Sequence, residues 1–107
     1  MKVILFGSES VVGSYFLSML DNTKIEIITP TMSDVKIGVN IDLYFEILGY
    51  MKKFENIDFV INCLELERQK GATLDRYIAI NSLFPRILNL VCKSLYKLYV
   101  CKTFVKG

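Results

Sequence analysis

The first twenty residues constrain the fold of this chain most, because they predict a buried strand, a tight turn and a helix in direct succession. Val3 to Phe6 form an unbroken apolar run, which is typical of a central strand in a parallel sheet covered on both faces. Gly7 ends this run, and apolar residues then recur at helical spacing, at Val12, Tyr15, Phe16, Met19 and Leu20. The turn therefore lies at a helix N-terminus, where unbonded N–H groups and the helix dipole favour an anion such as pyrophosphate.

The turn has glycine at the two positions where such a site needs it most. Gly7 allows the chain to turn sharply, and Gly13 lets the helix approach the strand. Ser10 stands at the middle position of a three-glycine loop, where its Cβ lies close to a phosphate path and its hydroxyl could donate to a phosphate oxygen. An ordinary strand-to-helix turn that binds nothing fits the same pattern. The candidate binding residues of this turn are Gly7, Ser8, Glu9, Ser10, Val11, Val12 and Gly13.

Strand and helix patterns alternate along the rest of the chain. Further strands are predicted at 24–29, 57–63 and 97–101, with at most a short edge strand at 35–37 inside a loop. Helices are predicted at 43–54, capped by Asp42, and at 74–95, capped by Thr73 and interrupted by Pro85. This order predicts an α/β fold, a three-layer, Rossmann-like, doubly wound parallel sheet truncated after about the fifth strand.

Residues 1–107 are expected to form a single domain, and the last predicted strand has no helix after it to cover one face of the sheet. An uncovered edge or face of a sheet can pair with another chain. We therefore expect that a homo-oligomer could form through this edge or face.

Charge and hydropathy exclude several classes of partner. Thirteen basic and eleven acidic residues give a net charge of +2, which is too small to predict nucleic-acid binding or attachment to an anionic membrane. No apolar run reaches the roughly 20 residues that span a bilayer, and the N-terminal apolar run is too short for a signal peptide. We expect a soluble, cytoplasmic protein.

Cysteine and histidine usage argues against a metal centre. The three cysteines, Cys63, Cys92 and Cys101, show no CxxC spacing, so neither a disulfide framework nor a zinc site is predicted. The chain contains no histidine, which removes the commonest metal ligand and the usual general base. No metal-binding residue is assigned.

Two asparagines lie where a ligand would be expected. Asn62 and Cys63 end a buried strand at the carboxyl edge of the predicted sheet, beside which ligands of open α/β sheets bind. Asn81 shares a helical stripe with apolar residues, so its amide must find partners. For both side chains, bridging of backbone groups and contact with a ligand remain open.

The end of the second strand does not indicate which nicotinamide cofactor would bind. An NAD site usually has an acidic residue there, and an NADP site has a nearby arginine or lysine. The sequence after Ile28 is Thr-Pro-Thr, which has neither signature. Lys36 is a distant candidate for contact with a 2′-phosphate, and the preference between NAD and NADP is left undetermined.

Three segments in this order resemble the extended short-chain dehydrogenase/reductases, and most of all the dTDP-4-dehydrorhamnose reductases. They are the turn Gly7 to Gly13, Asp58-Phe-Val-Ile-Asn62-Cys63 and Ile80-Asn81-Ser-Leu-Phe-Pro85, which resemble TGxxGQLG, DVVINCAA and VNxxAP of that family. The resemblance implies a Rossmann fold, an NAD(P) cofactor on the turn, and nucleotide-sugar reduction by the complete enzyme. It implies that Asn62, Cys63, Leu64 and Asn81 join the turn as cofactor-binding residues.

The departures from that family lead to two hypotheses. Leu64 and Glu65 replace small residues, Thr103 is a poor match to the catalytic Ser/Thr, and no Tyr-x-x-x-Lys pair occurs within 107 residues. We expect either the NAD(P)-binding portion of such a reductase without its substrate domain, inactive alone and with no catalytic residue, or a cofactor-free regulatory or protein-interaction module. A flavodoxin-like domain also fits the length, whereas a receiver domain would need aspartate in place of Asn62.

Overall fold

Four parallel strands form the centre of the protein. The computed structural model describes residues 1–21, 24–66, 73–96 and 101–103, and all statements about structure concern these residues. The strands pair in the order β2-β1-β3-β4, and every pair is parallel. They are β1 (Lys2–Phe6), β2 (Glu26–Ile28), β3 (Phe59–Asn62) and β4 (Cys101–Thr103). The predicted parallel α/β sheet is therefore confirmed.

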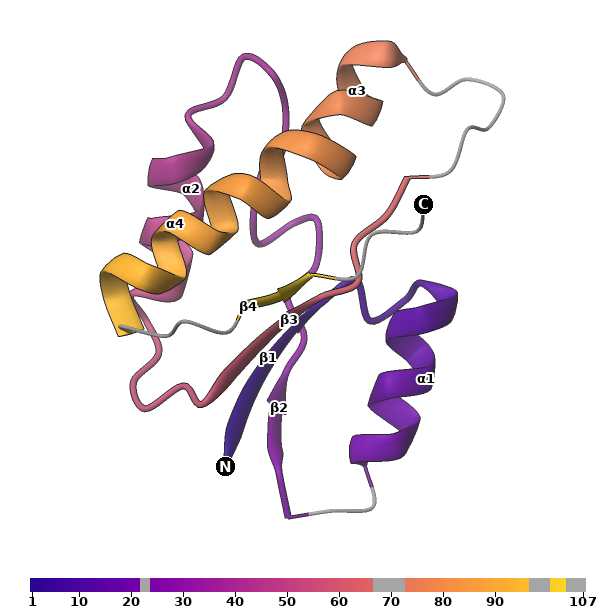
Figure 1. The fold of residues 1–107 in the computed structure, drawn as a ribbon, viewed down its shortest axis with the longest axis vertical. Coiled ribbons are helices and arrows are strands. Elements are labelled where there is room, and N and C mark those ends of the chain that lie inside the picture. The colour runs from indigo at the N-terminus through magenta and orange to yellow at the C-terminus, as the bar shows by residue number, and fades with distance from the viewer. Residues whose placement is uncertain (22–23, 67–72, 97–100, 104–107) are drawn as a thin grey trace.

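Helices cover both faces of the sheet, which gives three layers. Figure 1 shows α1 (Val11–Leu20) on one side of the sheet, and α2 (Leu43–Met51) and α4 (Phe84–Tyr96) on the other. The crossovers carry the chain from each strand to a parallel neighbour, as a doubly wound fold requires. The carboxyl ends of β1, β2 and β3 consequently meet at one edge of the sheet, where the turn Gly7 to Gly13 begins.

The core lies between the sheet and the α2/α4 layer. Alternate β1 residues, Ile4 and Phe6, point into it together with Val60 of β3. The rings of Phe6 and Phe84 pack edge to face with their centroids 5.2 Å apart. The other buried members of this core are Val35, Ile37, Leu43, Ile47, Met51, Ile57, Ala79, Ile80, Leu88, Val91 and Cys92.

The short edge strand predicted at 35–37 is wrong. These residues form no strand, and the described sheet has four strands rather than about five. Val35 and Ile37 are buried in the core, while the intervening Lys36 donates its backbone N–H to a carboxylate oxygen of Glu46, 3.3 Å away. The alternating apolar pattern of this segment thus reflects burial of Val35 and Ile37 in the core and not pairing with another strand. The resulting order is also the one found in flavodoxin-like sheets, so topology alone does not exclude that alternative.

Helix α1 packs on the sheet with only part of the predicted apolar stripe, since Phe16 and Leu20 are half-buried and the rest of the stripe is exposed. Gly13 is buried and Leu17 is half-buried, whereas Val12, Tyr15 and Met19 of the predicted stripe are 39%, 66% and 55% exposed. Apolar residues surround most of this helix, so their spacing does not select one face. The close approach at Gly13 fixes the rotation of the helix instead. An uncharged apolar flank of α1 is left exposed as a result.

The long helical region divides as its proline predicts. Helix α3 (Leu74–Ile78) begins at Thr73, whose hydroxyl accepts the N–H of Arg76, and continues into a π-helix at Ala79–Leu83 and then into α4. Pro85 has no N–H to donate to the preceding turn. The chain widens just before it, where the N–H of Phe84 donates to the carbonyl of Ala79 five residues earlier.

Other boundaries differ from the prediction by a few residues. Asp42 caps α2 as predicted, since its side chain accepts the N–H of Phe45, but the helix ends at Met51 rather than Phe54. The predicted strands 24–29 and 57–63 are shorter in the structure, as the bounds of β2 and β3 show. The predicted strand 97–101 falls mostly outside the described residues, and β4 begins at Cys101.

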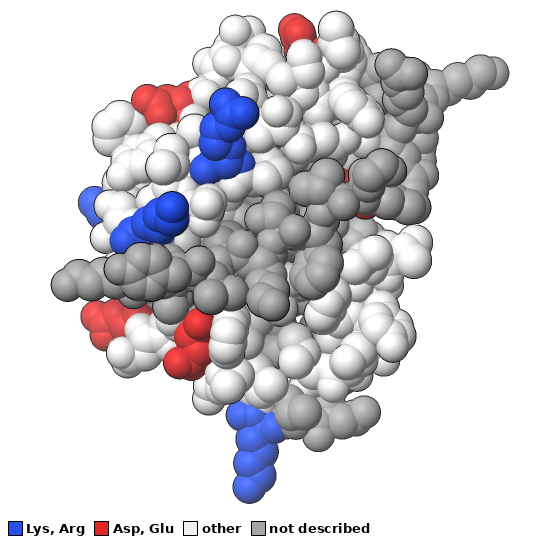
Figure 2. Space-filling view, viewed as in Figure 1, with Lys and Arg blue, Asp and Glu red and all other residues white. Residues whose placement is uncertain are grey.

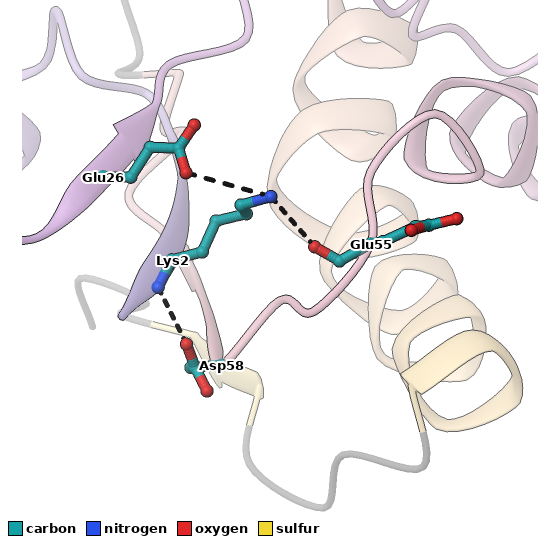
Figure 3. Close-up of polar contacts among 4 residues, drawn as sticks. All are labelled: Lys2, Glu26, Glu55 and Asp58. Atoms are coloured by element: carbon teal, nitrogen blue, oxygen red, sulfur yellow. Dashed lines mark hydrogen bonds and ion pairs between the residues drawn. The ribbon is translucent and has the colours of Figure 1, made fainter.

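Lys2 fixes the position of β1 at the amino-terminal edge of the sheet (Figure 3). Its backbone N–H donates to Oδ2 of Asp58 at 2.8 Å, and its Nζ donates to the carbonyl of Glu55 at 3.1 Å. The same Nζ lies 3.8 Å from Oε2 of Glu26. An exposed ion pair of this kind contributes little stability. It links β1 to β2, and the two hydrogen bonds link β1 to the segment before β3. These charges lie at the end of the sheet opposite to the turn.

Candidate functional site

The two glycines of the turn occupy positions where no side chain fits. Gly7 has a φ of +75°, and a Cβ on it would lie 2.5 Å from the carbonyl carbon of Cys63. A Cβ on Gly13 would collide with the carbonyl oxygen of Gly7 and lie 2.7 Å from its carbonyl carbon. The roles predicted for both glycines are therefore confirmed: one permits the turn and the other the close contact between helix and strand.

Ser10 is the N-cap of α1, and its hydroxyl is used inside the turn. The oxygen accepts the N–H of Gly13 at 3.0 Å and lies within donating distance of two carbonyls, those of Gly7 at 2.7 Å and Cys63 at 3.0 Å. A hydroxyl has one proton, and both of these acceptors belong to the protein. Ser10 thus ties the turn to the end of β3, and its hydroxyl is directed at backbone rather than outward.

Two backbone donors are left at the start of α1. The N–H groups of Val11 and Val12 have no hydrogen-bond acceptor among the described residues, as is usual in the first turn of a helix. No acidic residue lies in that first turn of α1. The positive end of the helix dipole and these N–H groups therefore form a position suited to an anion.

A pocket of about 280 Å³ opens beside the turn, at the carboxyl edge of β1. Three segments line it: the turn, the residues that follow β2 and the residues that follow β3. Its apolar wall includes Pro30, Met32, Val35 and Ile37, and its charged lining residues within the described part of the chain are Glu9 and Glu65. The lining residues are Phe6, Gly7, Ser8, Glu9, Ser10, Pro30, Thr31, Met32, Val35, Ile37, Leu64 and Glu65. The pocket thus brings together five of the predicted site residues, Gly7, Ser8, Glu9, Ser10 and Leu64.

Asn62 and Cys63 lie behind this pocket rather than on its surface. Asn62 is 1% exposed, and its Oδ1 accepts the N–H of Leu64 at 3.0 Å. Cys63 is equally buried, donates its N–H to the carbonyl of Phe6 at 2.8 Å, and has a thiol whose pKa is raised by burial. A thiol of this kind is a poor nucleophile near neutral pH. Both residues shape the end of β3 and the start of the pocket wall.

Asn81 holds the other end of that wall. Its Oδ1 accepts the N–H of Leu66 at 2.9 Å, and its Nδ2 donates to the carbonyl of Leu66 at 2.8 Å. The oxygen and the nitrogen of the Asn81 amide are therefore both bonded to the backbone of Leu66. This supports the backbone-bridging alternative. Asn81 belongs to the π-helix and fixes the segment that carries Leu64 and Glu65 into the pocket.

The segment after β2 contributes residues that the sequence analysis missed. Met32, Val35 and Ile37 line the pocket, and a compact turn between Thr31 and Asp34 presents them. Oδ2 of Asp34 accepts the N–H of Thr31 at 2.7 Å and its hydroxyl at 3.0 Å. These bonds lower the pKa of the carboxyl, the backbone bond most of all. The spacing Thr-x-x-Asp followed by alternating Val and Ile is the signal that would have found this wall.

The charged side chains of the described residues do not gather into one large patch on the face shown in Figure 2. On the face shown in Figure 2, basic and acidic side chains are interspersed among the described residues. Within the described part of the chain, no group of three or more potential metal ligands occurs. None of the described helices has both the length and the apolar character needed to cross a membrane.

Comparison with known proteins identifies structural neighbours only. No family model and no curated protein sequence matches this chain. A dTDP-4-dehydrorhamnose reductase from Clostridium acetobutylicum is similar over 88% of this chain, with 20% identity and a TM-score of 0.70. A dTDP-4-dehydrorhamnose reductase from Yersinia enterocolitica is similar over 87%, with 18% identity and a TM-score of 0.61. The protein lin1944 from Listeria innocua is similar over 86%, with 19% identity and a TM-score of 0.62.

The chain matches only part of each of these proteins. It covers 32% and 31% of the two reductases and 48% of the Listeria protein. At this level of identity the similarity concerns the fold alone, and it agrees with the parallel sheet described above. The chain has the Rossmann-like fold of dTDP-4-dehydrorhamnose reductases, over about a third of their length.

Proposed function

We propose that this chain is the nicotinamide-dinucleotide-binding portion of a nucleotide-sugar reductase, with the pyrophosphate of NAD(P) at the turn from Gly7 to Gly13. The observation that carries the proposal is the pocket beside two unbonded N–H groups at the start of α1. Open α/β sheets bind dinucleotides at this edge, with the pyrophosphate on a helix N-terminus. The fold shared with two reductases agrees with this function, because a reductase needs a reductant.

Each part of the site has a separate task in this proposal. The N–H groups of Val11 and Val12 bind phosphate oxygens, and Gly7 and Gly13 keep that surface free of side chains. Because the Ser10 hydroxyl is directed at backbone carbonyls, it acts by holding the turn. The apolar wall after β2 packs against the adenosine half of the cofactor. When bound, the dinucleotide would supply a hydride.

The chain by itself should bind the cofactor without catalysing reduction. Hydride transfer to a ketone needs an acid that protonates the developing alkoxide. No Tyr-x-x-x-Lys pair is present within these 107 residues, and the chain has no histidine. Binding, not turnover, is therefore the property to measure.

Titration with NADH, followed by nicotinamide fluorescence, tests the proposal. We expect saturable binding that weakens about fivefold in the variant Val11→Pro, because this change deletes one N–H that faces the phosphate. Proline suits the first position of a helix, and Ser10 before it already has the extended backbone that proline requires, so the fold should persist. Val11→Ala is the matched control, since it keeps the N–H. No saturation at millimolar NADH would refute the proposal.

The exposed flank of α1 favours a second candidate, a protein-interaction module that binds no cofactor. This helix has no charged residue, yet Val11, Tyr15 and Met19 are 86%, 66% and 55% exposed. Apolar surface of this kind marks a contact with another chain. Sedimentation at several protein concentrations tests it: we expect an association that Tyr15→Lys abolishes, and a monomer at every concentration would remove this candidate.

A further inference from the structure

The charged side chains that line the pocket are both acidic among the residues that the structure describes. Glu9, on the turn after β1, and Glu65, on the segment after β3, line it, and no lysine or arginine does among the described residues. Lys36 was the only basic residue that the sequence offered near the end of β2. It is exposed, it is not part of the pocket lining, and its backbone N–H is bonded to Glu46.

A third carboxylate stands beside the apolar wall. Asp34 is held in the turn with Thr31, whose backbone N–H and hydroxyl both donate to it. Thr31 itself lines the pocket. These two bonds lower the pKa of the Asp34 carboxyl, which keeps it ionised at neutral pH. Asp34 therefore fixes a lining residue without itself lining the pocket, and Glu9 and Glu65 are the carboxylates of the described lining.

We propose that this pocket selects NAD(H) over NADP(H), with Glu9 as the specificity-determining residue; this inference rests on the proposed function above. The two cofactors differ only by a 2′-phosphate on the adenosine ribose, which adds about two negative charges at neutral pH. In open α/β sheets that ribose lies between the glycine turn and the end of the second strand. Glu9 is the charged lining residue of the turn, and Thr31 lines the pocket from the segment after β2.

Electrostatics sets the direction and size of the selection. Among the described residues, a 2′-phosphate in this pocket would meet carboxylates and no lysine or arginine of the lining, whereas a free 2′-hydroxyl can donate a hydrogen bond to a carboxylate. Glu9 is exposed, so water screens its repulsion. We expect NADH to bind about tenfold more tightly than NADPH at low salt, with a smaller ratio as salt is added.

Dissociation constants of NADH and NADPH, measured for the same set of variants, test this inference. Glu9→Gln removes the charge and keeps the shape, and it should strengthen NADPH binding at least threefold more than NADH binding. Glu65→Gln should act in the same direction. Glu55→Gln is the matched control, because Glu55 lies beside Lys2 at the opposite end of the sheet, and it should leave the ratio unchanged.

The possible results separate this inference from the function on which it rests. The inference is supported if NADH binds more tightly than NADPH and if the ratio of their dissociation constants falls in Glu9→Gln but not in Glu55→Gln. Equal or tighter binding of NADPH by the unaltered protein overturns the selectivity and leaves dinucleotide binding intact. If Glu9→Gln leaves the ratio of the two dissociation constants unchanged, Glu9 does not determine the selectivity. Failure of both cofactors to bind overturns the proposed function and this inference together.

Discussion

Replacing Gly13 by alanine is expected to lower the free energy of unfolding by about 3 kcal/mol. The new Cβ would overlap the carbonyl oxygen of Gly7, and that atom belongs to backbone that cannot rotate away. Helix α1 would have to move off the sheet, which would also break the bond between Ser10 and the N–H of Gly13. Urea denaturation followed by circular dichroism measures the change.

Gly49→Ala is the matched control for this prediction. Gly49 lies inside α2, and a Cβ there would meet no atom within 4 Å. The same substitution should therefore stabilise the protein by about 0.5–1 kcal/mol, because alanine is the better helix former. If both variants shifted stability in the same direction, the contact between Gly13 and Gly7 would not have the importance assigned to it.

Replacing Asn81 by alanine is expected to cost about 2 kcal/mol, because it leaves the N–H and the carbonyl of Leu66 without their partners. The segment that carries Leu64 and Glu65 should loosen as well, so the amide proton of Leu66 should exchange with solvent much faster. Urea denaturation and hydrogen exchange of this amide provide the two measurements.

Two further variants separate the role of the Asn81 amide from that of any exposed asparagine. Asn81→Asp keeps an acceptor for the N–H of Leu66 but sets a carboxylate oxygen against its carbonyl, so it should lose at least as much stability as alanine while keeping more protection of the Leu66 amide from exchange. Asn40 is exposed in a turn, and Asn40→Ala should change stability by less than about 0.5 kcal/mol. Unchanged exchange at Leu66 in Asn81→Ala would contradict the assigned contact.

The turn and the alternation of strands and helices along the chain could be predicted because their causes are local. The run from Val3 to Phe6 is apolar without alternation, as a strand covered on both faces requires, and Gly7 ends it. The side chains of Asp42 and Thr73 accept backbone N–H groups three residues later, so the start of each helix is visible in sequence. Pro85 likewise indicates an interruption of the long helix, because proline has no N–H to donate to the preceding turn.

The remaining features depend on contacts between distant segments. The rotation of α1 is set by Gly13 against Gly7, and an all-apolar helix gives no second signal. Val35 and Ile37 alternate as in a strand, yet they pack into the core and help to line the pocket. The partners of Asn81 lie fifteen residues away, so the sequence predicted that partners exist but did not identify them.

Mapping of NADH binding by amide proton–nitrogen correlation spectra tests the central claim most directly. The account predicts that added NADH shifts the amide signals of Ser8 to Ser10, Leu64 and Glu65, which line the pocket, and those of Val11 and Val12 at the start of α1. The signal of Gly49 in α2, outside this pocket, should stay in place and serves as the internal reference. Saturable shifts confined to the pocket residues and the start of α1 would support cofactor binding at the turn, and an unchanged spectrum at millimolar NADH would contradict it.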